Sequence, residues 1–164
     1  MNARPAIREA TPADDDAIWA IIGPVFQAGE TYPIPRDISR AEALRYWRTP
    51  GHWVFVAEQD GRIVGTYYLR ANQKGGGAHV CNCGYIVAPG ETGRGVARAM
   101  CEHSLGEARK RGFTAMQFNF VVASNERAVR LWQSCGFKIV GTLPDVFAHP
   151  VRGPVDAYVM HRAL

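Results

Sequence analysis

A glycine-rich turn between a strand and a helix is the feature that most constrains this chain. Residues 85–98 read Tyr-Ile-Val-Ala-Pro-Gly-Glu-Thr-Gly-Arg-Gly-Val-Ala-Arg. Such a turn presents free backbone N–H groups, and the helix that follows adds partial positive charge, so the segment favours binding of a phosphate or pyrophosphate. The glycines are not in the order of the dinucleotide fingerprint, and no Gly-Lys-Ser/Thr follows as in a Walker loop. A turn that serves only packing is the alternative.

The rest of the chain predicts strands and helices in one continuous series. Ser39 and Glu42 form a capping box, and Asp60-Gly61 favours a tight hairpin turn. We expect strands at 7–10, 53–58, 62–71, 80–87, 113–122, 137–143 and 155–162, and helices at 12–27, 39–47, 96–111 and over about ten residues ending before Gly136. No internal repeat or linker is present. The pattern predicts a single domain over 1–164 of the α/β (α+β) class, with a mixed sheet and helices on both faces.

Composition and charge exclude several classes of protein. The hydrophobic fraction of 47% and the charged fraction of 21% are those of an ordinary globular chain. No apolar run reaches the roughly 20 residues that a membrane span needs, and the N-terminus has no apolar signal core, so we expect a cytoplasmic protein that does not enter membranes. The net charge of +4 comes from scattered Lys and Arg, which argues against a nucleic-acid surface.

The four cysteines do not form a metal-binding pattern. Cys81, Cys83, Cys101 and Cys135 contain no Cys-x-x-Cys pair, and no His-x-x-x-His lies nearby. We therefore expect no metal site, and thiols that are reduced and mostly buried. Cys135 is expected to serve packing.

Two segments together resemble the GNAT superfamily of acetyl-CoA-dependent N-acetyltransferases. In that family a strand ending Val-x-Pro precedes a phosphate loop Gln/Arg-x-x-Gly-x-Gly/Ala. Here Val87-Ala88-Pro89 precedes Thr92-Gly93-Arg94-Gly95-Val96-Ala97. Thr92 replaces the family's long polar side chain, and Arg94 or Arg98 is the candidate to compensate. Residues 125–137 are similar to a second segment of the family, Asn-x-x-Ala-x-x-Leu-Tyr-x-x-x-Gly-Phe.

The resemblance implies a cofactor, a fold and a mechanism. Acetyl-CoA is the implied co-substrate, held by residues 92–98 and by Asn125, which is alternatively a simple helix cap. The implied sheet is mostly antiparallel, with six to seven strands, and its fourth and fifth strands splay apart to admit pantetheine beside Val87. A backbone N–H near Ile86 or Val87 would then face the thioester carbonyl. One fixed donor of this kind contributes roughly 3 kcal/mol to acyl transfer, and the amine attacks directly with no covalent acetyl-enzyme.

Trp132 stands where many relatives have the tyrosine that protonates the departing thiolate. An indole N–H donates a hydrogen bond but does not deliver a proton near neutral pH. A thiol with a pKa near ~8.5 leaves adequately as a thiolate, so an acid is dispensable. We expect Trp132 to shape the pocket or to steady the leaving sulfur.

The acceptor amine needs a base or a path of water to solvent. Glu30, in the polar-aromatic loop at 29–35, is the first candidate, because this loop commonly forms the acceptor wall in the family; a solvated loop carboxylate is the alternative. Asn82 and Asn119 lie on otherwise apolar strands, where they orient an acceptor carboxylate or amide, or else bond within the sheet.

The C-terminal part supplies a further candidate for the acceptor wall. The segment 143–150, followed by Asp156 and Tyr158, is expected to close over the acceptor, whereas His149 within it is expected to be an exposed loop residue.

These expectations combine into one function and three alternatives. The favoured function is transfer of acetyl to the primary or secondary amine of a small molecule, such as an amino acid or a toxic analogue of one. The alternatives are a protein or peptide N-acetyltransferase, a non-catalytic acyl-CoA sensor, and an unrelated nucleotide-binding module. A homodimer is common in the superfamily and is left open here.

Overall fold

The computed structural model describes residues 4–164, and these residues form one seven-stranded sheet. The strands are β1 (Ala6–Glu9), β2 (Trp53–Gln59), β3 (Arg62–Ala71), β4 (Val80–Val87), β5 (Ala115–Val122), β6 (Lys138–His149) and β7 (Gly153–Ala163). Their order in the sheet is β1-β2-β3-β4-β5-β7-β6, and β4–β5 is the parallel pair in an otherwise antiparallel sheet. The predicted mixed, mostly antiparallel sheet is therefore confirmed.

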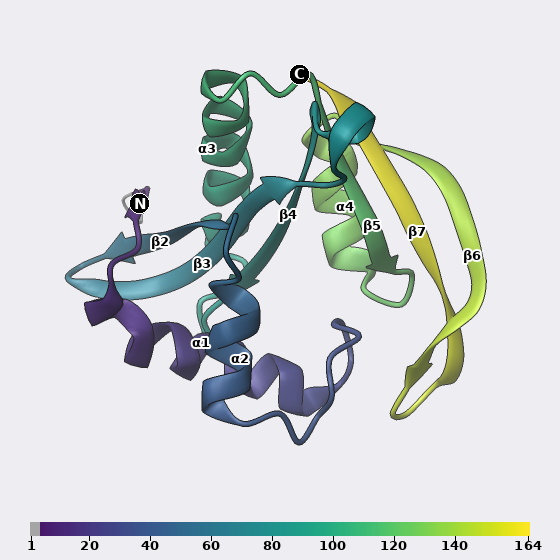
Figure 1. The fold of residues 1–164 in the computed structure, drawn as a ribbon. Helices are drawn as coiled ribbons and strands as arrows, with labels where there is room; N and C mark the ends of the chain where they lie inside the picture. The colour runs from purple at the N-terminus through teal and green to yellow at the C-terminus, as the bar shows by residue number, and fades with distance from the viewer. Residues whose placement is uncertain (1–3) are drawn as a thin grey trace.

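Helices cover both faces of the sheet, as predicted (Figure 1). The helices are α1 (Asp15–Ala28), α2 (Arg40–Trp47), α3 (Val96–Lys110) and α4 (Glu126–Ser134). Side chains of α1 and α2 form one apolar cluster with Val54, Val56 and Ile86. Side chains of α3 and α4 form the other cluster against the opposite face. The alternation of side chains along each strand thus separates two cores.

Local sequence signals account for the helix ends. The predicted capping box is present, since Ser39 Oγ accepts from the Glu42 N–H at 3.2 Å and the Glu42 carboxylate accepts from the Ser39 N–H at 3.0 Å. Helix α1 ends at Gly29, whose φ of 66° is in the left-handed region that glycine favours. Between residues 4 and 164, none of the helices combines the length and the apolar character that crossing a bilayer requires.

Strands β4 and β5 separate soon after they begin, which confirms the predicted splay. Only Val80 with Ala115 and Cys81 with Met116 pair between the two strands. Beyond these pairs the strands diverge, with α4 behind the opening (Figure 1). The backbone edge of β4 that would otherwise pair with β5 is therefore free to bind a ligand in the manner of an added strand.

The C-terminal strands differ from the prediction. The predicted strand 137–143 extends further, because residues 143–149 of the segment expected to close over the acceptor form the second half of the long strand β6, which pairs with β7 through a bulge between Leu143 and Phe147. The bulge explains the difference, because Pro144 interrupts the strand pattern without ending the pairing. His149 lies at the turn, where its Nδ1 accepts from the N–H groups of Val151 and Arg152 at 3.2 Å.

The four cysteines are free thiols and all are buried, as the sequence indicated. Cys81 and Cys83 lie on β4, Cys101 on α3 and Cys135 after α4. Each belongs to the cluster between α3, α4 and the sheet, where a thiol packs as a small apolar side chain.

Candidate active site

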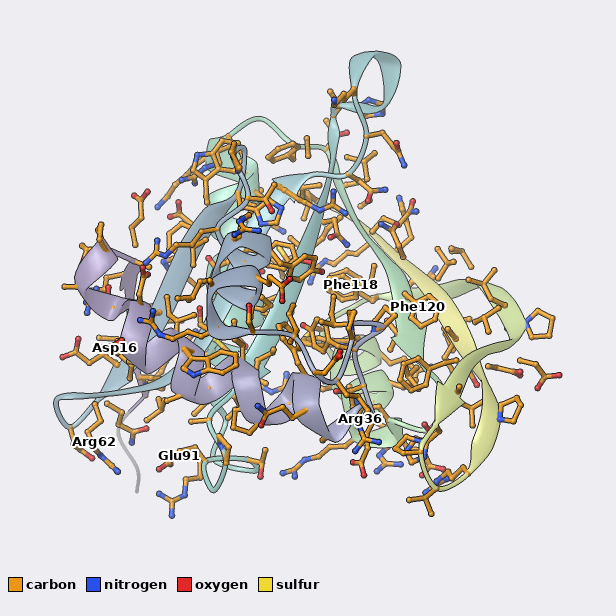
Figure 2. All side chains as sticks on the ribbon, turned by 60° about the horizontal axis from the view of Figure 1, so that its bottom comes forward. Asp16, Arg36, Arg62, Glu91, Phe118 and Phe120 are labelled. Atoms are coloured by element: carbon orange, nitrogen blue, oxygen red, sulfur yellow. The ribbon has the colours of Figure 1, made fainter. Side chains whose placement is uncertain are left out.

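A cavity of about 670 Å³ occupies the opening between β4 and β5. Its walls are the two diverging strands, the loop after β4, the start of α4 and the loop between α1 and α2. Figure 2 shows Phe118 and Phe120 of β5 beside this opening, well away from Glu91 in the loop after β4. The cavity therefore has one end at that loop and another between the aromatic side chains.

The loop end is built for an anion. Gly93 and Gly95 have φ values of 83° and 81°, a conformation that requires glycine, and Gly95 is the N-cap of α3. A Cβ on Gly93 would lie 2.6 Å from Nη2 of Arg127, so this glycine leaves room for a guanidinium over the loop. Arg127 lines the cavity and the sequence analysis missed it. A missing Cβ, free N–H groups and a cation together fit a pyrophosphate.

The predicted cofactor residues are mostly brought together here. Thr92, Gly93, Gly95, Val96, Ala97, Arg98 and Asn125 all line the cavity. Arg94 does not line it, because its guanidinium pairs with the Glu91 carboxylate at 3.1 Å and turns outward. The candidate to compensate for Thr92 is thus Arg98 or the newly identified Arg127, and not Arg94.

Asn125 combines both of the roles that the sequence left open. Its side-chain oxygen accepts from the Ala128 N–H at 3.4 Å and caps α4. It also lines the cavity. The amide –NH2 of its side chain remains available to a ligand.

The pairing of β4 with β3 decides which backbone groups face the opening. The Ala88 N–H donates to the Val64 carbonyl, and at the other end the Asn72 N–H donates to the Val80 carbonyl, both at 2.8 Å. Even-numbered residues of β4 therefore direct their backbone groups toward β3, and odd-numbered residues direct theirs toward the opening. The N–H groups of Tyr85 and Val87 face the cavity, whereas the Ile86 N–H faces Thr66. Of the two predicted donors, only Val87 is suitably directed, and Tyr85 is a second donor that the sequence analysis missed.

Trp132 packs into the wall of the cavity. Its ring lies 4.9 Å from that of Tyr85 and 5.2 Å from that of Phe118, centroid to centroid. The Tyr85 hydroxyl is held by Ser104 at 2.7 Å, and burial raises its pKa well above the ordinary value. The indole does not deliver a proton near neutral pH, and the Tyr85 hydroxyl is occupied by its bond to Ser104.

The other end of the cavity is aromatic. Tyr32, Tyr46 and Tyr68 line it, and the Tyr32 hydroxyl donates to the Tyr85 carbonyl at 3.1 Å. A Cβ on Gly84 would lie only 2.6 Å from the Tyr68 ring, so this glycine allows the ring to lie against β4. Burial raises the pKa of both Tyr32 and Tyr68, and their hydroxyls stay protonated.

The two asparagines expected at this end both form hydrogen bonds within the protein. Asn82 is buried; its Nδ2 donates to the Gln117 carbonyl at 2.9 Å and its Oδ1 accepts from Arg70 Nε at 3.3 Å. Asn119 donates to Asn72 Oδ1 at 2.6 Å. Both asparagines line the cavity, but both are already bonded within the sheet.

Glu30 is not brought into the cavity. Its side chain is exposed, and the neighbouring Thr31, Tyr32 and Pro33 line the wall instead. The loop at 29–35 thus lines the cavity through these three residues. Glu30 is not supported as the base, because its carboxylate faces solvent after the turn at Gly29. Asp156 and Tyr158 also lie outside the lining; Asp156 accepts from the Asp145 N–H at 3.0 Å.

Arg70 was missed by the sequence analysis. It lines the aromatic end of the cavity from β3. The signal was a single arginine near the end of the apolar strand Ile63–Leu69, but its position beside Asn82 follows from strand pairing and not from local sequence.

Comparison with known proteins identifies relatives for this fold and site. The sequence matches the acetyltransferase (GNAT) family over residues 19–137. The structure of a GCN5-related N-acetyltransferase from Kribbella flavida superposes with a TM-score of 0.93 at 40% identity, covering 97% of each chain. The N-acetyltransferase aca1 of Schizosaccharomyces pombe is 29% identical over 81% of this chain and 72% of its own length.

A longer relative also matches. The mycothiol acetyltransferase of Streptomyces avermitilis is 29% identical over 80% of this chain, and the match covers 42% of that protein. The chain thus spans less than half the length of this relative.

Proposed function

The chain belongs to the GNAT acetyltransferase family, and from that premise we propose that it acetylates the amine of a small molecule by direct transfer from acetyl-CoA. Acetyl-CoA is the co-substrate of the family, and it supplies an acetyl thioester to the site. The observation that carries the proposal is the backbone edge of β4, which presents the Tyr85 and Val87 N–H groups to an open cavity between strands. A small acceptor is favoured because the end opposite the loop is enclosed by tyrosines.

We propose that different residues of the cavity bind different parts of acetyl-CoA. Backbone N–H groups of Gly93 and Gly95, with Arg127 and Arg98, bind the pyrophosphate. Val87 pairs with the pantetheine arm as a neighbouring strand does. Because Tyr85 lies two residues farther from the loop, its N–H is nearer the thioester and stabilises the negative charge that develops on the carbonyl oxygen.

The acceptor loses its proton without a protein base at the acceptor end. Glu91 is the one carboxylate that lines the cavity within residues 4–164; it lies at the loop end, paired with Arg94 at 3.1 Å. Histidine is absent from that same lining set. The amine therefore reacts as the neutral species that is already present in solution, and water carries away the proton released after attack.

The experiment that tests this function measures thiol release from acetyl-CoA with amino acids, polyamines, aminoglycosides and short peptides as acceptors, together with acetyl-CoA binding. Release that depends on a small amine is expected. Release only with peptides favours the protein-acetylating alternative, and saturable binding without any release favours an acyl-CoA sensor. Absence of binding contradicts the assignment of Gly93 to Ala97.

We also propose a homodimer through the edge strand β6. This strand is one of the two edges of the sheet, the other being β1, and Val140 and Val146 on it are 61% and 45% exposed. An unpaired edge that also carries exposed apolar side chains favours pairing with a second copy. Sedimentation analysis is expected to show a dimer that Val140→Lys dissociates; a wild-type monomer contradicts this proposal and leaves the catalytic one untouched.

A further inference from the structure

Among residues 4–164, Arg70 has no anionic partner at the aromatic end of the cavity. Its Nε donates to Asn82 Oδ1 at 3.3 Å, and no carboxylate of residues 4–164 lies within 4.0 Å of its guanidinium. The residue is only partly exposed and lines the cavity. A partly buried guanidinium with its two terminal nitrogens unpaired is set up to bind an oxyanion from outside the protein.

Arg70 is held in place by the strands on which the site is built. Arg70 on β3 is the register partner of Asn82 on β4, and Asn82 in turn donates to the Gln117 carbonyl on β5 at 2.9 Å. The chain of hydrogen bonds thus crosses three strands where β4 and β5 part. Because Nε already donates to Asn82, the two terminal Nη groups of the guanidinium are the ones that remain available to a ligand.

The position of Arg70 excludes the phosphates of the co-substrate as its partner. The phosphate-binding loop follows Val87 at the C-terminal end of β4, whereas Arg70 pairs with Asn82 near the N-terminal end. The two sites lie at opposite ends of the same cavity. The anion that Arg70 binds therefore belongs to the acceptor.

The spacing along β4 fits an acceptor with its anion close to its amine. Tyr85 and Asn82 are three residues apart, which is about 10 Å at the usual strand rise of ~3.3 Å per residue. The acetyl carbonyl at the Tyr85 N–H and the side chain of Arg70 each take up part of this distance. The remaining space accommodates a carboxylate a few bonds from the attacking nitrogen.

We infer that Arg70 binds the carboxylate of the acceptor, and that the substrates are short amines bearing a carboxylate, of the amino-acid class. This inference rests on the proposed acetyl transfer. Tyr32, Tyr46 and Tyr68 form the surrounding wall and contact the rest of the acceptor. Asn82 is a positioning residue that orients the guanidinium through Oδ1, and it does not need to touch the acceptor.

The test compares acceptors that differ only at the carboxylate. A panel of L-amino acids is assayed beside the corresponding primary amides and decarboxylated amines, with wild type, Arg70→Gln and Arg70→Lys. Arg109→Gln is the matched control, since Arg109 is exposed on α3 away from the cavity. Melting curves and the KM for acetyl-CoA confirm that each variant is folded and retains its phosphate site.

The expected result is a loss confined to one class of acceptor. Arg70→Gln lowers kcat/KM for amino acids by about 100-fold, the effect of losing a bidentate charged contact, and changes it little for the amides and amines. Arg70→Lys recovers only part of the loss, because an ammonium does not match the planar carboxylate. An equal loss for all three kinds of acceptor, or a wild type indifferent to the carboxylate, overturns the inference.

A binding measurement separates this inference from the proposed transfer. Calorimetry follows the same amino acids titrated into wild type and Arg70→Gln, each saturated with CoA. If wild type releases no thiol yet binds amino acids and Arg70→Gln does not, transfer fails and the carboxylate site stands. If transfer to small amines occurs without dependence on Arg70, the carboxylate site fails and transfer stands.

Discussion

The Tyr32 hydroxyl donates a 3.1 Å hydrogen bond to the backbone carbonyl of Tyr85. This contact joins the loop between α1 and α2 to the strand that presents the N–H donors of the site. It also occupies a carbonyl on the free edge of β4, which a ligand arm would otherwise reach. The proposed acceptor wall and the proposed oxyanion donors are therefore joined by a direct hydrogen bond.

Removing this hydroxyl is expected to weaken acceptor binding. Tyr32→Phe loses one neutral hydrogen bond of about 1 kcal/mol, so kcat/KM for the acceptor falls about 5-fold while the KM for acetyl-CoA stays within a factor of about two. Steady-state kinetics with both substrates varied measure this change. Tyr158→Phe on β7, outside the cavity, is the control, and an equal loss in that variant contradicts a role for the loop contact.

Adding one methyl group to β4 is expected to damage the acceptor site selectively. The Cβ of Gly84→Ala meets the Tyr68 ring at 2.6 Å and displaces it. We expect overpacking to destabilise the protein by about 1–3 kcal/mol and to raise the acceptor KM at least about 10-fold. Thermal melts and kinetics check both effects. Gly76→Ala, where a Cβ meets no atom within 4 Å, should change neither; unaltered kinetics in Gly84→Ala would show that the Tyr68 ring has no part in binding.

Two glycines of the phosphate loop provide a matched pair. Gly90 and Gly93 have φ values of 85° and 83°, so alanine strains either backbone by about 1 kcal/mol or more. Only at Gly93 does the new Cβ displace Arg127, at 2.6 Å from Nη2. Isothermal titration with acetyl-CoA is expected to show about 10-fold weaker binding for Gly93→Ala than for Gly90→Ala. Equal affinities would remove Arg127 from the cofactor site.

The pH dependence of kcat/KM is expected to be set by the pKa of the acceptor amine and not by a titrating group of the enzyme. Burial raises the pKa of Tyr32 and Tyr68, so neither ionises between about pH 6 and 9. Because no carboxylate or histidine of residues 4–164 lines the acceptor end, kcat/KM is expected to rise with pH as the neutral amine becomes more abundant, up to the pKa of the amine itself. Two acceptors of different amine pKa should give profiles displaced by that difference. Profiles that share one midpoint would reveal a protein base.

Trp132→Phe tests whether the indole N–H assists the leaving sulfur. The ring makes a tilted contact with Tyr85 and an edge contact with Phe118, and phenylalanine preserves an aromatic surface but loses the donor. Because a thiolate departs without an acid, we expect kcat to fall less than about 3-fold, with unchanged affinity for acetyl-CoA. A large loss of kcat at preserved affinity would instead assign the N–H to the sulfur.

The fold and the glycine-rich turn after β4 were predictable from the sequence for a physical reason. Periodicity and the positions of glycines are local properties, so the four helices and the turn at Gly93 and Gly95 are recognisable from short windows, whereas the splay of the two strands is implied by the family resemblance. The acceptor end depends on strand register, which no short window contains. Ile86 and Val87 are equivalent in sequence, and only pairing with β3 shows that Val87 faces the opening. Arg70 and Asn82 are likewise distant in the chain and adjacent in the sheet, while Glu30 sits in a predicted loop but turns outward.

The Asn82–Gln117 bond has a consequence for the length of acyl donor that the site accepts. It closes the opening at one end, and the glycine loop lies at the other, so in the proposed site the stretch of β4 between them sets the length of pantetheine arm that fits. A truncated thioester that lacks the nucleotide loses the anchor that sets its register against Tyr85. A bulkier acyl donor keeps this anchor, so its extra carbons are expected to extend toward the closed end of the opening. The opening between β4 and β5 is therefore expected to hold the donor at its phosphate end and to limit the length of its acyl group at the closed end.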